Sequence, residues 1–251
     1  MQNIATPITH MTTPTKMPSG ACCMRVMDFA DFLTEVAPAS VDLMLTDPPY
    51  TISRDTGFKN LGSKSVKRFA VDMHFGEWDT MPIDLGMLAG LAWRALRAGG
   101  TAIIFYDVWK ISHLAEAMTE AGFKQIRLIE WVKTNPVPLN SKRNYLTNSR
   151  ECAVLGVKGG KPTFNSEYDN GMYYYPIASS GRHGKRLHPT QKPLQLMADL
   201  VQKHSARGDL VIDPFLGAGT TALAAIQNER RFAGCDKDAE YVAVAKKRLA
   251  G

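Results

Sequence analysis

The chain has 251 residues, 45% of them hydrophobic and 22% charged, so it can bury the core of one α/β domain. It contains no run of about 18 apolar residues, which excludes a membrane-spanning helix, and its start lacks the pattern of a secretory signal, so a cytoplasmic location is expected. No metal site or disulfide framework is expected, because the four cysteines (Cys22, Cys23, Cys152 and Cys235) form no C-x-x-C pair.

The net charge of +6 favours an acidic partner, and its distribution is uneven. The segment from Lys124 to Lys192 holds twelve basic and four acidic residues, so it carries +8 while the rest of the chain carries −2. An ordinary solvated face could have this composition. Because the segment also holds many aromatic residues and few helix signals, a polyanion-binding surface is the favoured interpretation.

Residues 1–20 are rich in Thr, Pro and Met without periodicity, and we expect a disordered tail there. Short β-rich apolar runs then predict seven buried strands: Met24–Asp28, Val41–Thr46, Thr101–Tyr106, Gln125–Val132, Glu151–Val157, Leu210–Asp213 and Arg231–Cys235. Helical patterns fall between many of them: Asp84–Arg97, Trp109–Ala121, Pro193–Ala206, Thr220–Gln227 and Ala239–Leu249. This alternation predicts a doubly wound α/β fold, with a mostly parallel sheet covered by helices on both faces.

One gap breaks the alternation. No helical pattern separates Gln125–Val132 from Glu151–Val157, so we expect these two strands to pair antiparallel at an edge of the sheet. The long segments 51–80 and 158–189 are irregular, and such loops in a compact domain are usually functional or disordered. We therefore predict a single domain over residues 21–251, with a mobile loop at 51–80.

A glycine-rich turn, Asp213-Pro214-Phe215-Leu216-Gly217-Ala218-Gly219-Thr220-Thr221, follows one predicted strand and opens a helix. The glycines let a ligand approach the backbone, and the start of the helix offers unpaired N–H groups. Asp213 at the strand end suits a ligand ammonium group. Asp236 ends the next strand about twenty residues downstream, where a carboxylate accepts hydrogen bonds from ribose hydroxyls. The glycines alone would fit a plain tight turn, but the whole arrangement favours nucleoside binding.

The tetrapeptide Asp47-Pro48-Pro49-Tyr50 follows the predicted strand Val41–Thr46. Two prolines cannot continue a sheet ladder, so they stiffen the turn and fix its carbonyl directions. Asp47 then lies at the carboxyl end of a parallel strand, where open α/β sheets bind ligands. Its carboxylate and a rigid carbonyl can accept hydrogen bonds from one amino group, and Tyr50 offers a flat face to a base. The alternative is a plain proline turn with a capping Asp. This alternative is less favoured because the chain also contains the glycine-rich turn.

At these residues the chain resembles the amino-group DNA methyltransferases, which act on adenine N6 or cytosine N4. Asp47–Tyr50 looks like their catalytic motif and Phe215–Gly219 like their cofactor motif; this order is similar to the circularly permuted β class. In that class a target-recognition segment lies between the two motifs, here within about 134–189. His188–Pro193 looks like the family's segment that lies along the methionine part of the cofactor. The resemblance covers roughly residues 24–249 and implies a Rossmann-like, S-adenosylmethionine-dependent fold with seven strands, one of them antiparallel.

The resemblance implies methyl transfer from S-adenosylmethionine to a base flipped out of double-stranded DNA. Adenine N6 is favoured because a leading Asp accompanies adenine more often in the family, and a leading Ser accompanies cytosine. Asp47 and the carbonyl of Pro48 would hold the amine in the turn stiffened by Pro49, and Tyr50 would receive the base. We expect loop 51–80 to close over the base or the phosphates, and a simple mobile surface loop is the alternative.

The resemblance also implies a set of binding residues. Asp236 would hold the ribose, the glycine turn would lie along the methionine part, Thr190 or Lys192 would meet its carboxylate, and Asp28 would reach the cofactor adenine. For Lys192 a charge at a helix start is the alternative, and for Asp28 an ordinary N-cap. The cofactor candidates are Asp28, Thr190, Lys192, Asp213, Phe215, Gly217, Gly219, Thr220 and Asp236. The DNA candidates are Arg143, Tyr145, Asn148, Arg150, Arg182, Lys185 and Arg186, with the run Tyr173–Tyr175, which could equally be partly core.

Three other functions stay open at this point. Cytosine-N4 methylation uses the same chemistry. A nicotinamide-dependent dehydrogenase would use a similar sheet, but it leaves Asp47–Tyr50 without a role. A DNA-binding protein that has lost catalysis is the third, and the intact Asp47 and Tyr50 argue against it. The resemblance also allows a homodimer, and either a partner restriction enzyme or an enzyme that acts alone.

Overall fold

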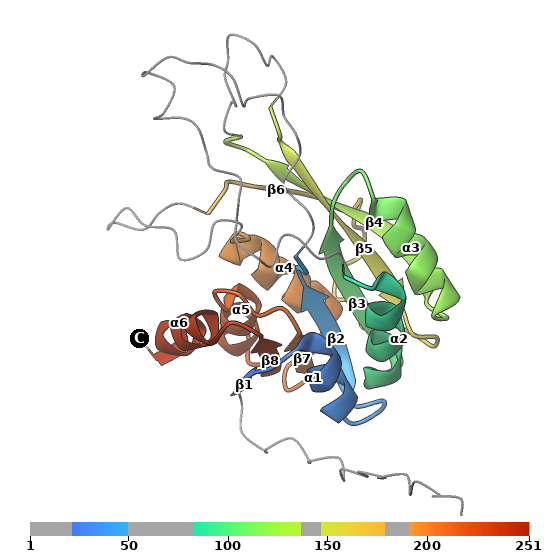
Figure 1. Ribbon diagram of the computed structural model, residues 1–251. Coiled ribbons are helices and arrows are strands. Elements are labelled where there is room, and N and C mark those ends of the chain that lie inside the picture. The colour runs from blue at the N-terminus through green and yellow to red at the C-terminus, as the bar shows by residue number, and fades with distance from the viewer. Residues whose placement is uncertain (1–21, 50–82, 137–146, 179–190, 251) are drawn as a thin grey trace, which may run out of the picture.

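The computed structural model describes residues 22–49, 83–136, 147–178 and 191–250, and every structural statement below concerns these residues (Figure 1). In chain order the elements are β1 (Cys22–Val26), α1 (Phe29–Glu35), β2 (Val41–Thr46), α2 (Leu85–Ala95), β3 (Leu96–Tyr106), α3 (Ile111–Glu120), β4 (Lys124–Lys133), β5 (Arg150–Val157), β6 (Met172–Tyr175), α4 (Leu194–His204), β7 (Leu210–Asp213), α5 (Thr220–Gln227), β8 (Arg231–Asp236) and α6 (Ala239–Ala250). None of these helices is long and apolar enough to cross a membrane.

The strands form one sheet in the order β1-β8-β7-β2-β3-β5-β4-β6. Every neighbouring pair is parallel except β3–β5 and β4–β5, so β5 is the one reversed strand. This arrangement confirms the doubly wound, mostly parallel sheet with one antiparallel strand. Among the described residues the sheet has eight strands rather than the seven expected, because β6 forms within the segment 158–189, where the sequence predicts irregular structure. The expected antiparallel pair is β4–β5, but β6 pairs with β4 and takes the edge position.

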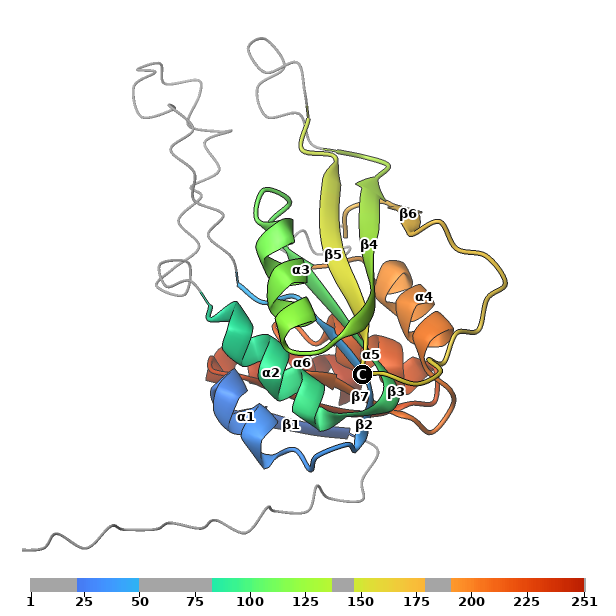
Figure 2. The same cartoon turned by 90° about the vertical axis from the view of Figure 1, so that its right-hand side faces the viewer.

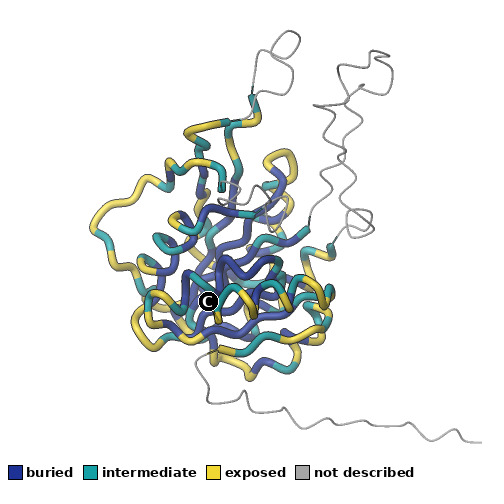
Figure 3. Tube along the Cα trace, turned by 90° about the vertical axis from the view of Figure 1, so that its left-hand side faces the viewer, coloured by how far each residue is buried: buried dark blue, intermediate teal, exposed yellow. Residues whose placement is uncertain are grey.

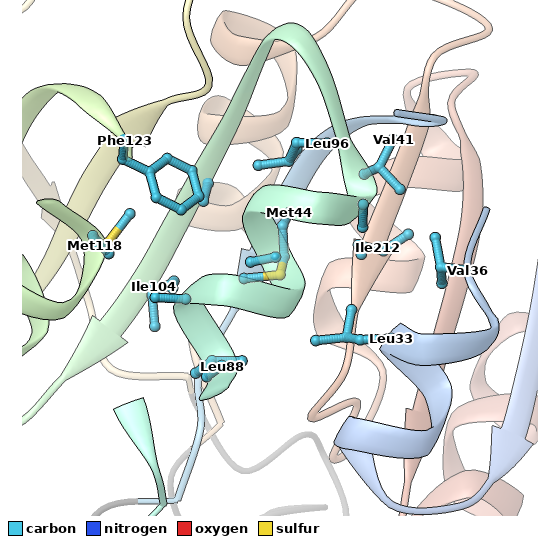
Figure 4. Close-up of a cluster of buried hydrophobic side chains, with 14 of the residues drawn as sticks. Leu33, Val36, Val41, Met44, Leu88, Leu96, Ile104, Met118, Phe123 and Ile212 are labelled. Carbon is cyan, nitrogen blue, oxygen red and sulfur yellow. The ribbon is translucent and has the colours of Figure 1, made fainter. Parts of the chain in front are cut away.

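Helices cover both faces of the sheet (Figures 1 and 2). On one face α1, α2 and α3 bury Leu33, Leu88 and Leu114 in a core cluster that also contains Met44 of β2, and Figure 4 draws this cluster. On the other face α4, α5 and α6 pack against a second cluster that contains Leu43 and Leu45. Side chains of β2 thus alternate between two buried faces, which explains its unbroken apolar sequence. Figure 3 shows the buried chain in the centre and the exposed chain at the periphery.

Helix α1 was missing from the sequence analysis. It has only seven residues, and Asp28 caps it by accepting a hydrogen bond from the Ala30 backbone N–H at 2.8 Å. Phe32 and Leu33 are its buried residues, which is too short a pattern to establish a helical period. By contrast, the predicted bounds of β2, β7 and α5 match the observed ones at every residue.

Candidate active site

Both motif-bearing turns lie at the same edge of the sheet. Strands β2 and β7 pair in parallel, with Leu43 opposite Val211 and Met44 opposite Ile212, so the turns that follow them begin side by side. The Thr46 hydroxyl donates a hydrogen bond of 2.6 Å to Oδ1 of Asp213 and ties the two turns together. Residues separated by 167 positions in the sequence therefore form one site, as the two motifs predicted.

Left-handed backbone shapes the glycine turn. Gly217 has φ 48° and Gly219 has φ 75°, values that favour glycine. A Cβ on Gly219 would lie 2.7 Å from the Cβ of Ala245 on α6, so this position has no room for a side chain. No side chain caps α5 at Gly219, which leaves the helix start able to donate N–H groups to a ligand. The buried hydroxyl of Thr220 accepts a hydrogen bond from Arg248 at 3.0 Å.

Asp213 holds the two turns together from inside the protein. Its Oδ1 accepts from the Thr46 hydroxyl and from the Phe215 backbone N–H at 3.1 Å. Burial raises the pKa of its carboxyl to about 6, against the lowering effect of these hydrogen bonds. The proposed contact between Asp213 and a ligand ammonium group stays a prediction, because Oδ1 is already engaged with donors of the protein.

Asp236 ties the end of β8 to the glycine turn. Its Oδ2 accepts from the Gly217 N–H at 2.8 Å and its Oδ1 from the Asp238 N–H at 3.0 Å. Burial raises the pKa of this carboxyl. Each carboxylate oxygen can accept a second hydrogen bond, so a pair of ribose hydroxyls could still bind here.

The remaining cofactor candidates on this side lie around the start of α1. The ring of Phe215 contacts that of Phe29, with centroids 5.0 Å apart. Asp28 lies next to Phe29, and the Met27 N–H donates to the Asp236 carbonyl at 3.0 Å, which places Asp28 beside the same edge. Asp28 does cap α1, so the N-cap alternative holds in the structure, and its contact with the cofactor adenine stays a prediction.

The Asp47 carboxylate has two unlike oxygens. Oδ2 accepts a hydrogen bond from Nζ of Lys192, whereas Oδ1 is buried and has no partner among the described residues. Burial raises the pKa of Asp47, Lys192 lowers it, and Glu151 raises it further. A buried carboxylate oxygen without a donor is costly, so this atom fits a ligand that brings an N–H group. Pro48 beside it is buried and Pro49 is half-buried.

Lys192 lies between two carboxylates rather than at an open helix start. Only 3% of its side chain is exposed, and its Nζ contacts Asp47 and lies 3.0 Å from Oε2 of Glu151. The sequence predicts that Thr190 or Lys192 meets the cofactor carboxylate, which stays a prediction, and no pattern in the sequence singles out Glu151. The reversed direction of β5 brings Glu151 to this edge, and the predicted antiparallel pairing was the one signal that could have located it.

The structure describes only some of the DNA-binding candidates. Arg150 is exposed and lies 3.6 Å from Glu130, and Asn148 is exposed just before β5. Tyr173 is buried, and its hydroxyl donates to Asp169 at 2.5 Å, whereas 57% of Tyr174 is exposed. Tyr173 is therefore part of the core, whereas Tyr174 faces solvent. The candidates Tyr50, Arg143, Tyr145, Arg182, Lys185, Arg186 and Thr190 lie outside the described residues, as do the tail 1–20 and the loop 51–80.

Comparison with known proteins places these features in context. A family model described as DNA methylase matches residues 41–247. The chain is 31% identical over 247 residues to the Type II methyltransferase M2.DpnII of Streptococcus pneumoniae, covering 88% of this chain and 87% of that protein. It is 30% identical over 236 residues to M2.MboI of Moraxella bovis, covering 87% and 84%.

Solved structures agree with the sequence comparisons. The M1.HpyAVI–SAM complex has a TM-score of 0.67 and 29% identity, covering 91% of this chain and 98% of that one. The cytosine-N4-specific PvuII DNA methyltransferase has a TM-score of 0.69 over 91% and 88% of the two chains. At 19% identity the second likeness establishes the fold alone.

Proposed function

This chain belongs to the N6/N4 family of DNA methylases, and we propose on that basis that it methylates the N6 amino group of adenine in double-stranded DNA. Family membership makes it a DNA methyltransferase that uses S-adenosylmethionine; the choice of base is the proposal. The observation that supports an amino group as the acceptor is the buried Oδ1 of Asp47, which has no hydrogen-bond partner among the described residues and lies next to Thr46, the residue bonded to Asp213. Adenine is favoured because a leading Asp in this tetrapeptide accompanies adenine more often than cytosine in the family. Cytosine N4 is the second candidate, because the family includes both activities.

The residues of the glycine turn fit the cofactor. Asp236 would accept from the ribose hydroxyls with its remaining lone pairs, and the left-handed glycines Gly217 and Gly219 would let the methionine part approach the backbone. Phe215 and Thr220 flank this turn, and we keep Asp28 and Thr190 as further contacts. When bound, S-adenosylmethionine supplies a methyl group on a positive sulfur, whose leaving group is neutral.

Asp47 would act on the acceptor nitrogen. The lone pair of an exocyclic amine is delocalised into the ring, so the nitrogen is a weak nucleophile until hydrogen-bond acceptors draw the N–H groups out of the ring plane. Oδ1 of Asp47 and the Pro48 carbonyl would be those acceptors, and positioning of this kind contributes about 7–11 kcal/mol in favourable cases. The amine held in this way would take the methyl group that bound S-adenosylmethionine would supply, and the electrons of the carbon–sulfur bond would stay with the neutral sulfur product. The nitrogen then loses one proton, which Asp47 can accept.

The substrate must expose its base to this edge. We propose base flipping, with Tyr50 receiving the base and loop 51–80 closing over it. We assign target recognition to residues within 134–189, of which Asn148 and Arg150 are exposed at the start of β5 and can contact phosphates. The Type II names of the relatives favour a restriction–modification role, and a homodimer stays a prediction.

The test is a product analysis. Purified protein is incubated with mixed-sequence duplex DNA and S-adenosylmethionine carrying a labelled methyl group, and the DNA is digested to nucleosides for mass spectrometry. We expect N6-methyladenine. N4-methylcytosine would support the second candidate, and a protein that binds S-adenosylmethionine but labels no DNA would be a DNA-binding protein without catalysis. Single-molecule sequencing of DNA from expressing cells would then identify the recognition site.

A further inference from the structure

Four charged side chains of alternating sign form a row along the active edge of the sheet, which we call the ion row: Asp47, Lys192, Glu151 and Lys133. Lys192 contacts Asp47 and lies 3.0 Å from Glu151. Nζ of Lys133 lies 2.9 Å from Oε1 of Glu151, the other oxygen of that carboxylate. The two acidic and two basic side chains give the ion row no net charge. Each of them is largely buried, with 3–23% of the side chain exposed.

The reversed strand creates the ion row. The carboxyl ends of β2, β3 and β4 meet at this edge, and only an antiparallel strand can bring its beginning to the same place. Glu151 pairs with Trp131 of β4, next to Cys152, which pairs with Tyr106 at the end of β3. Lys192 bridges from β2 to β5 across the ring of Phe105 on β3, with its Nζ 5.0 Å from the ring centroid.

Glu151 and Asp47 share the ammonium group of Lys192. A buried lysine needs compensating charge, and here two carboxylates share that role. The negative charge of Glu151 raises the pKa of Asp47, whereas Lys192 lowers it. Without Glu151, Lys192 would act on Asp47 alone and make that carboxylate a weaker acceptor for a proton.

We propose that Glu151 is a positioning residue for methyl transfer. It holds Lys192 so that the ammonium group fixes Oδ2 of Asp47 and leaves Oδ1 available to the target amine. Glu151 acts through Lys192 and needs no contact with either substrate. The inference rests on the role of Asp47 in the proposed function.

The first test compares Glu151→Gln with a matched control. Lys203 also bridges two carboxylates, Asp169 at 3.0 Å and Asp199 at 3.4 Å, so Asp199→Asn removes one charge from a similar group away from the site. We expect Glu151→Gln to slow single-turnover methyl transfer about 10–100-fold while the dissociation constants of DNA and S-adenosylmethionine change less than about 3-fold. Asp199→Asn should keep the wild-type rate within about 2-fold.

A double-mutant cycle tests whether Glu151 acts through Lys192. In a Lys192→Met background, adding Glu151→Gln should change the rate less than about 3-fold, because the intermediary is already gone. The acid limb of the rate–pH profile gives an independent readout. Within the part of the chain that the structure describes, the charged groups that face Asp47 are Lys192, Glu151 and Asp213, and removal of the Glu151 charge lets Lys192 lower the pKa of Asp47 further. The acid limb should therefore move to lower pH in Glu151→Gln.

Each outcome decides the inference. A near-wild-type rate in Glu151→Gln, an undiminished loss in the Lys192→Met background or an unmoved acid limb would overturn it. Should Glu151→Gln fail to fold, Glu151→Asp keeps the charge but withdraws it from Lys192; a rate about 3–10-fold slower is expected, and an unchanged rate contradicts the positioning role. The wild-type product in the same assay separates the two proposals, because methylated cytosine would overturn the choice of base without affecting the role of Glu151.

Discussion

The glycine turn and the ion row are neighbouring parts of the proposed active site, and different interactions hold each of them together. Around the glycine turn, the carboxylates of Asp213 and Asp236 accept hydrogen bonds from backbone N–H groups, and most of these contacts span few residues. On the acceptor side, the ion row joins four separate chain segments through charged side chains, with Lys192 and Asp47 lying 145 residues apart. The glycine turn, the proposed cofactor side, is thus a local backbone structure, whereas the ion row, the proposed acceptor side, depends on the folded sheet. Changes on the two sides should have separable effects.

The strongest test of this separation is Asp47→Ala. We expect methyl transfer to fall at least about 1,000-fold, because both the amine contact and the proton acceptor are lost. Cofactor affinity should stay within about 3-fold of the wild type, since Asp47 belongs to the acceptor side. Isothermal titration and a methyl-transfer assay measure the two quantities, with the exposed Asp31→Ala on α1 as a control that retains activity. Retained transfer would refute the role of Asp47.

Asp236→Ala should weaken cofactor binding and leave the rate of methyl transfer at saturating cofactor largely intact. It removes the hydrogen bond from the Gly217 N–H of the glycine turn and the one from the Asp238 N–H after β8, together with the expected ribose contacts. Hydrogen bonds to a charged group contribute about 1.5–3 kcal/mol, so cofactor affinity should fall about 10–100-fold. At saturating cofactor, transfer should recover most of its rate. A variant whose rate stays low at saturation would show that the two sides are coupled.

Gly219→Ala tests the backbone of the cofactor side in the absence of any ligand. The left-handed φ of 75° and the nearby Cβ of Ala245 should cost about 1–3 kcal/mol of unfolding free energy. Gly90→Ala is the matched control, because a Cβ there meets nothing within 4 Å on helix α2, and it should add about 0.5–1 kcal/mol. Urea unfolding measures both changes, and equal effects would mean that the strain at Gly219 is absent.

The two sides also differ in how far the sequence predicts them. The bounds of β2, β7 and α5 were predicted correctly because turn residues such as Pro48 and Gly219 punctuate short apolar runs. The four-residue strand β6 lies in a polar, glycine-containing segment, and its pairing with β4 is a tertiary contact without a local pattern. Glu151 was missed for the same reason. Its importance comes from the reversal of β5 and from a lysine distant in the sequence, so only the assembled sheet shows it.

The smallest expected effect concerns the hydrogen bond that joins the two sides. Thr46→Val keeps the side-chain shape but removes the donor to Asp213, at a cost of about 1–2 kcal/mol. The pKa of Asp213 is about 6 in the folded protein and 3.8 ordinarily, so its contribution to stability is fully present below 3.8 and is lost as pH rises through 6. Loss of the Thr46 donor raises that pKa further.

The penalty of Thr46→Val should therefore be larger at pH 8 than at pH 5, because the ionised carboxylate needs the hydroxyl more than the protonated form does. Urea unfolding of the variant and the wild type at the two pH values measures the difference. Thr119→Val on α3 is a suitable control, since its hydroxyl donates to a backbone carbonyl on the exposed side of that helix and no carboxylate is involved. A pH-independent penalty at Thr46 would mean that Asp213 does not change its protonation state between pH 5 and pH 8, which would contradict a pKa of about 6.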